Sequence, residues 1–234
     1  MFRKLRHFTA GLLIVFLLAG IIPVTTAEAA VKKPANCRFV SWKNSSFTSC
    51  RVAWDKVSGL GGSDYYEIRW THTDGSSYHH RYQYSSINVL DIKNLSPGHI
   101  YKVAVRTVKT NGKAITGFSS WSNTAFITPM PTSISLKLTD RKKRHVKIGW
   151  NKIQGASGYA IWLATSPAGK WTLHQSVKSG RLSAAVTNYK KGRLKTNFYY
   201  YVRIFPLPPG KGKNASLPVP SVSYYTYRFK ILNR

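Results

Sequence analysis

Residues 95 to 105 limit the possible folds of this chain more than any other stretch. They contain the turn Pro97-Gly98, in which proline fixes its own φ and glycine accepts a positive φ. Tyr101, Val103 and Val105 then recur at every second position, as the buried face of a β-strand requires. A tight turn followed at once by an alternating strand predicts an all-β protein.

Similar short segments fill the chain after residue 30, and no stretch there has helical periodicity. The first seven expected strands are residues 37–43, 49–56, 65–72, 78–84, 87–92, 99–108 and 124–128. After the stiff connector Pro129-Met130-Pro131, seven more are expected at 134–138, 146–150, 159–164, 171–176, 182–187, 198–205 and 222–229. This density of strands predicts two β-sandwich domains, residues 31–129 and 130–234.

The two halves repeat each other and resemble fibronectin type III domains. Trp54 and Trp150 match the core tryptophan of that family, and Tyr101 with its Leu-x-Pro-Gly turn matches the tyrosine corner. Tyr200 corresponds to Tyr101, but the basic loop Lys190–Lys195 stands where the turn would be, so the corner of the second half stays open. The resemblance implies two tandem seven-stranded immunoglobulin-like sandwiches after an N-terminal signal peptide.

The first thirty residues have the pattern of a secretory signal. Arg3, Lys4 and Arg6 precede an apolar run over residues 11–24, and the A-x-A pattern Ala27-Glu28-Ala29 follows it. We expect a signal peptide over residues 1–30, no membrane span in the mature form, and a secreted, extracellular protein, with association with the cell wall as a further expectation. The alternative is an uncleaved anchor.

Cys37 and Cys50 suit an oxidising compartment and lie on adjacent expected strands. A disulfide that closes a short loop is the preferred interpretation. Two separate buried thiols are the alternative, because spacing alone does not bring two Cα atoms close enough.

Charge gives the strongest indication of function. The chain has 36 basic and 7 acidic side chains, a net charge of +29. Residues 30–130 hold 13 basic and 5 acidic side chains, whereas residues 131–234 hold 20 basic and 1 acidic. The second half is therefore expected to face a polyanion.

The resemblance also implies where these cations gather. In such sandwiches the loops after the first, third and fifth strands share one end of the domain. The cations of those loops in the second half are Arg141, Lys142, Lys143, Arg144, Lys170, Lys190, Lys191, Arg193 and Lys195. We expect them to converge and bind phosphates or sulfates, and the alternative is a basic surface that is merely solvated.

The sequence has no catalytic motif, and Asp64 and Glu67, three positions apart on or near a strand, should point to opposite faces. We therefore expect no enzyme, cofactor or metal site. His72, His79 and His80 could face one another across a hairpin and ligate a metal, although exposed polar positions are the preferred interpretation. Residues 78–84 place Tyr78, His80, Tyr82 and Tyr84 on one face, which is expected to pack in the core or at an edge rather than stack on ligands.

These patterns predict a secreted, non-enzymatic adhesion or binding protein whose partner is an anionic polymer such as teichoic acid or an acidic polysaccharide. The loops 154–159 and 119–122 are similar to those of secreted bacterial members of the family, which implies a Gram-positive bacterial source. One alternative is a spacer or scaffold that binds a protein partner, and another is a carbohydrate-binding accessory that uses exposed aromatic rings. Nucleic acid is not expected, because export removes the protein from most of it.

Overall fold

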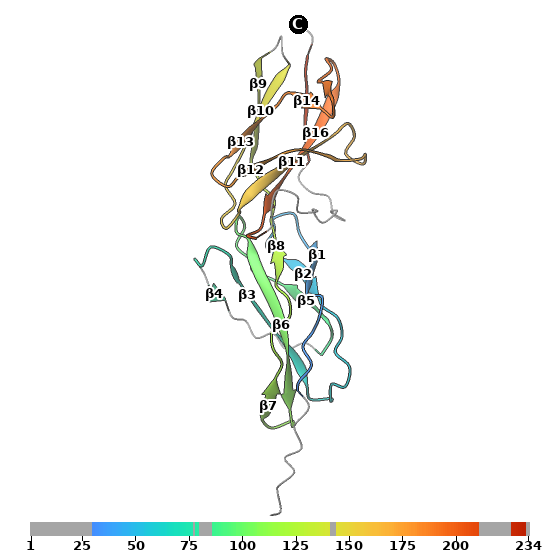
Figure 1. Ribbon diagram of the computed structural model, residues 1–234, viewed down its shortest axis with the longest axis vertical. Coiled ribbons are helices and arrows are strands. Elements are labelled where there is room, and N and C mark those ends of the chain that lie inside the picture. Colours follow the sequence, from blue (N-terminus) through green and yellow to red (C-terminus); the bar gives the residue numbers. More distant parts are fainter. Residues whose placement is uncertain (1–29, 77, 80–85, 141–143, 211–225, 233–234) are drawn as a thin grey trace, which may run out of the picture. The chain divides into compact units, whose positions relative to one another are not determined.

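A computed structural model describes residues 30–76, 78–79, 86–140, 144–210 and 226–232 (Figure 1). The expected signal peptide lies outside these residues, as do most positions of the aromatic face expected over 78–84. Residues Val31–Arg234 form one compact unit. Among the described residues, no helix has the length and apolar character needed to cross a bilayer.

Two sheets enclose the core of the first sandwich. One has the order β1-β2-β5, formed by Arg38–Trp42, Cys50–Ala53 and Val89–Ile92. The other has the order β4-β3-β6-β7, with β8 also paired to β6; these strands are Tyr78–His79, Tyr65–His72, Tyr101–Thr110, Ile115–Phe118 and Ala125–Ile127. The apolar faces of both sheets meet in one cluster, because alternate residues of each strand point inward.

The second sandwich repeats this plan. Its smaller sheet has the order β13-β10-β9, formed by Ser183–Val186, His145–Trp150 and Ile134–Asp140. Its larger sheet has the order β12-β11-β16-β17, formed by Thr172–Lys178, Gly158–Ala164, Tyr199–Leu207 and Tyr227–Lys230. A small hairpin pairs β14, Asn188–Tyr189, with β15, Gly192–Arg193. The all-β fold is confirmed, while β7 and this hairpin were not expected from the sequence.

The repeated tryptophans make the same contacts in both halves. Trp54 packs edge-on against Tyr66, with ring centroids 5.2 Å apart, and the Tyr66 hydroxyl accepts a hydrogen bond from the Val57 amide at 2.8 Å. Trp150 lies 5.4 Å from Tyr159, whose hydroxyl accepts from the Ile153 amide at 2.9 Å. The sequence repeat is therefore also a repeat of core packing.

The tyrosine corner expected at Tyr101 is present. Its hydroxyl accepts a hydrogen bond from the Ser96 amide at 2.7 Å while the ring is buried. The preceding Gly98 has a φ of +80°, which is the left-handed conformation that glycine tolerates. Leu95 anchors the same turn in the core.

The second half has the same corner, although its sequence lacks the Leu-x-Pro-Gly turn. The Tyr200 hydroxyl accepts from the Lys195 amide at 2.9 Å, again five residues upstream. Leu194 is buried where Leu95 is in the first half, and Asn197 has a φ of +54° where Gly98 was left-handed. Asparagine takes this conformation more readily than most residues, so it can replace glycine in the turn. The basic segment therefore adds cations to a retained turn instead of replacing it.

The preferred disulfide between Cys37 and Cys50 is wrong: both thiols are free and buried. The register of the β1–β2 hairpin explains why. Cys50 pairs with Trp42 at one end of β1, whereas Cys37 precedes Arg38, which pairs at the other end. Five strand residues span about 16 Å, well beyond the Cα separation of about 7 Å that a disulfide allows.

Both thiols are expected to resist alkylation in the native protein at pH 8. Burial raises the pKa of Cys37 to about 11 and that of Cys50 to about 12, so neither forms the reactive thiolate. After unfolding without a reductant, both should react, and mass spectrometry should find two labels on each chain. If the unfolded chain took up no label under those conditions, the two cysteines would have to be joined in a disulfide.

Candidate functional site

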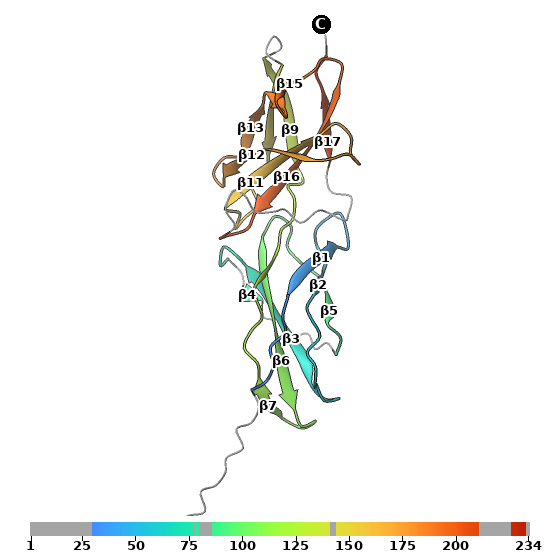
Figure 2. The same ribbon diagram turned by 45° about the vertical axis from the view of Figure 1, so that its right-hand side comes forward.

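The strand register brings three loops to one end of the second sandwich (Figure 2). β10 begins where β13 ends, since Val146 pairs with Val186, and the β9–β10 turn lies just beyond. β11 ends where β16 begins, since Ala164 pairs with Tyr201. The Arg144 guanidinium links the start of β10 to the segment before β16, because it donates a hydrogen bond to the Leu194 carbonyl at 3.0 Å. We call this end of the domain, with residues 144, 165–171 and 187–198, the basic end.

Most of the predicted cations that the structure describes lie exposed at the basic end. The exposed ones are Lys170, Lys190, Lys191, Arg193 and Lys195. Arg144 is half-buried because it is bonded to the Leu194 carbonyl. The remaining predicted residues, Arg141, Lys142 and Lys143, lie outside the described residues.

Carboxylates are scarce around these cations. Asp140 is the single acidic side chain between residues 131 and 234. The ion pairs found among the described residues all lie between positions 38 and 109, in the first sandwich. The basic end therefore presents a positive potential that its own domain does not neutralise.

Aromatic rings also reach the surface here, which was missed at the level of sequence. Phe198 and Tyr199 are 40% and 43% exposed. Arg228 and Lys230 of β17 lie over the Tyr199 ring at 5.2 and 5.3 Å from its centroid. The alternation of side chains along a strand could have revealed the exposure of Tyr199, because Tyr200 is a core residue and adjacent residues of a strand point to opposite faces.

In the first sandwich, Trp121 covers the outer face of β3 and β6. Arg69 lies 3.9 Å from the centroid of this ring and Arg106 lies 4.8 Å from it. The flanking Ser119 and Ser122 hydroxyls accept hydrogen bonds from backbone amides of β6 at 2.9 and 3.1 Å. The Ser-x-Trp-Ser segment thus completes the edge of the sheet and fixes the tryptophan, which is a structural role.

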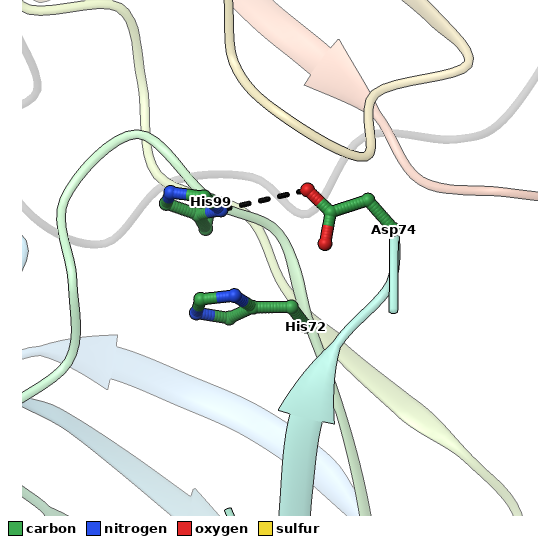
Figure 3. Close-up of side chains that lie close together, drawn as sticks. All are labelled: His72, Asp74 and His99. Atoms are coloured by element: carbon green, nitrogen blue, oxygen red, sulfur yellow. Dashed lines mark ion pairs between the residues drawn. The ribbon is translucent and has the colours of Figure 1, made fainter. Parts of the chain in front are cut away.

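The described residues do not test the metal site considered for His72, His79 and His80. His79 pairs with Trp70 along the backbone, and His80 lies outside the described residues. His72 instead lies beside Asp74 and His99, as Figure 3 shows. The two imidazoles are stacked, with centroids 4.2 Å apart and an interplanar angle of 13°.

Asp74 is held in place at the start of the β3–β4 turn. Its Oδ1 accepts the Ser76 hydroxyl at 2.6 Å and the Ser76 amide at 3.0 Å, and these bonds lower the pKa of the carboxyl. Its Oδ2 lies 3.6 Å from His99 Nδ1. We call His72, Asp74 and His99 the histidine cluster. His99 was missed because it belongs to the turn before β6, far from His72 in sequence.

Comparison with known proteins gives one family match. Residues 33–124 match the model of the fibronectin type III domain. A two-domain fibronectin type III segment of chicken tenascin is 12% identical with a TM-score of 0.34, over 85% of this chain and 99% of that chain. The FN1–FN3 domains of chicken CNTN1 are 16% identical with a TM-score of 0.32, over 87% of this chain and 69% of that one. No curated protein matches the sequence.

Proposed function

We propose that this chain, whose residues 33–124 are a fibronectin type III domain, is a secreted, non-enzymatic binding or adhesion protein. Its partner is an anionic polymer of a cell surface or cell wall, of the teichoic acid or acidic polysaccharide class. The second sandwich provides the contact. One observation carries the proposal: the strand register gathers separate cationic loops at an end of the domain where carboxylates are scarce.

Polymer binding by the basic end should depend steeply on salt. Each phosphate or sulfate that a cation neutralises releases condensed counterions, so affinity falls as salt rises. The exposed lysines lie on loops, and the ion pairs of the described residues do not include them, which leaves them able to adapt to an irregular polymer. The Arg144 guanidinium and the Tyr200 hydroxyl bind the backbone of Leu194 and Lys195, which keeps the segment between β15 and β16 in place.

Replacing Lys190, Lys191, Arg193 and Lys195 with alanine should weaken binding to teichoic acid at least tenfold at low salt. The slope of log affinity against log salt should also fall, by up to about 3, because four phosphate contacts are lost. Binding is measured by retention on immobilised teichoic acid and by titration with the free polymer.

A matched control variant tests whether the affinity depends on the cations of the basic end or only on the total charge of the protein. It replaces four exposed lysines of the first sandwich, Lys56, Lys93, Lys102 and Lys113, none of which makes an ion pair in the described structure. This control changes the net charge by the same amount and should keep most of the affinity. Equal losses in the two variants would rule out a specific role for the basic end.

The exposed rings at the basic end favour a second candidate, binding of a neutral glycan. Stacking of a sugar on Phe198 and Tyr199 would survive high salt, unlike polyanion binding. Retention on a neutral glucan at 1 M salt that is lost in the double variant Phe198→Ala, Tyr199→Ala would support this candidate. Salt-resistant capture of a defined protein would instead support the scaffold alternative.

A further inference from the structure

We propose that His72, Asp74 and His99 form a binding site for a transition-metal ion of the Zn²⁺ class in the first sandwich. Each of the three residues offers one ligand atom, and these atoms lie within 4.8 Å of one another. The inference is independent of polymer binding, because it concerns other residues in the other sandwich.

The donor set is the one that this class of ion prefers. Two imidazole nitrogens and a carboxylate oxygen suit Zn²⁺, Ni²⁺ or Cu²⁺, whereas Ca²⁺ and Mg²⁺ favour sites made of oxygen alone. Three protein ligands leave a fourth position for water or another donor. The carboxylate of Asp74 also gives the cluster a negative charge for the cation.

The two histidines come from parts of the backbone that are fixed by hydrogen bonds. His72 ends β3, which pairs along its whole length with β6, and its ring packs edge-on against Tyr101 at 4.6 Å. The residues on both sides of His99 are fixed by hydrogen bonds with Gln154, in which Gly98 O accepts at 2.7 Å and Ile100 N donates at 3.0 Å. A fixed backbone of this kind lowers the cost of binding, because only side chains have to move.

A second shell is already in place. Ser76 fixes Oδ1 of Asp74 and also lies 2.9 Å from His72 Nδ1, so one side chain orients two of the three ligands. Oδ2 of Asp74 is left facing His99. Outer-shell partners that orient carboxylates and imidazoles in this way are typical of metal sites.

Binding requires one movement. The lone pair of an imidazole nitrogen lies in the plane of its ring, so two stacked rings cannot both point at one ion. Zn²⁺ bonds of 2.0–2.1 Å also need donors about 3.4 Å apart, closer than the widest separation in the cluster. His99, whose side chain is 27% exposed, is the ring that can turn, since His72 is buried and held by Ser76 and Tyr101. Metal binding should therefore break the imidazole stack.

The test is titration of the purified protein, without a polyhistidine tag and after treatment with EDTA, with ZnCl₂. Calorimetry and competition with a chromophoric chelator should give one tight site per chain. His99→Ala and Asp74→Asn should each weaken this site at least tenfold, and Ser76→Ala should weaken it less. His174→Ala, which changes a histidine outside the cluster, should leave it unchanged. These positions are chosen over His72, whose burial makes its loss a threat to folding.

Two further readouts make the outcome decisive. Zn²⁺ should raise the melting temperature of the native protein but not that of His99→Ala, and the His72 and His99 ring signals should shift in NMR spectra as the stack opens. Tight Zn²⁺ binding that persists in both His99→Ala and Asp74→Asn would overturn the proposal. So would the absence of saturable binding below about 1 mM Zn²⁺, or displacement of Zn²⁺ by an equal concentration of Ca²⁺.

Discussion

Alanine at Trp54 is expected to lower the free energy of unfolding of the first sandwich by about 3–5 kcal/mol, and alanine at Trp150 should do the same in the second. Both rings are buried, at 0% and 6% exposure, and each packs against a buried tyrosine, with ring centroids 5.2 and 5.4 Å apart. Removing either ring leaves a cavity between the two sheets that the rigid ladders cannot close. The measurement is denaturant-dependent hydrogen exchange, which follows peptides of the two sandwiches separately.

Phenylalanine at the same positions should lower the free energy of unfolding by less than half as much as alanine does. Within the described residues, Nε1 of Trp54 and of Trp150 is buried without a hydrogen-bond partner, so losing it breaks no hydrogen bond. Trp171→Ala is the surface control: that ring is partly exposed beneath Arg203, and its loss should cost less than about 1 kcal/mol. A Trp171 effect as large as that of Trp150 would contradict the assignment of the core.

Asp64→Ala should destabilise the first sandwich by about 3 kcal/mol. This carboxylate is 3% exposed and accepts three hydrogen bonds, from Lys109 Nζ at 2.6 Å, the Gly61 amide at 2.6 Å and the Thr110 amide at 3.0 Å. Its removal leaves these donors without their acceptor at the end of the β3–β6 ladder. Asp91→Ala is the matched control, since the Arg51–Asp91 pair is 41% and 28% exposed and should contribute about 1 kcal/mol or less.

The contribution of Asp64 should also depend on pH. Burial by itself raises the pKa of this carboxyl, but hydrogen bonds from Lys109, Thr110 and Gly61, with the charge of Lys109, outweigh it and lower the pKa. A lowered pKa gives stability that is fully present above the unfolded value of about 4 and is lost as the pH falls below it. The difference in unfolding free energy between the native protein and Asp64→Asn should therefore shrink from pH 6 to pH 3. A constant difference would show that the carboxylate charge is not involved.

The second tyrosine corner shows that a structural motif can form without the residues that usually mark it in a sequence. The Leu-x-Pro-Gly turn before Tyr101 is visible in the sequence, whereas the turn before Tyr200 uses Leu194 and Asn197. The shared requirements are a buried leucine six residues before the tyrosine and a left-handed residue three before it. A search for these physical roles would have found both corners.

The histidine cluster and the basic end differ in how far the sequence could predict them. Most cations of the basic end occur in runs between expected strands, so they could be found by counting charges along the sequence. The cluster joins the end of β3 to a turn 27 residues later, and only the pairing of β3 with β6, where His72 faces Tyr101, brings the two together. Tyr78 to Tyr84 gave a pattern that the described residues do not test.

Most strands, their inward faces, the internal repeat and the concentration of charge in the second half could be predicted from the sequence, whereas β7 and the β14–β15 hairpin could not. Alternation with a period of two encodes which face of a sheet a residue occupies, and composition encodes charge. Neither encodes where along its partner a strand begins to pair, because a strand shifted by two residues keeps the same faces. Tertiary structure therefore decided that Cys37 and Cys50 lie at opposite ends of a hairpin. It also decided that His99 reaches His72.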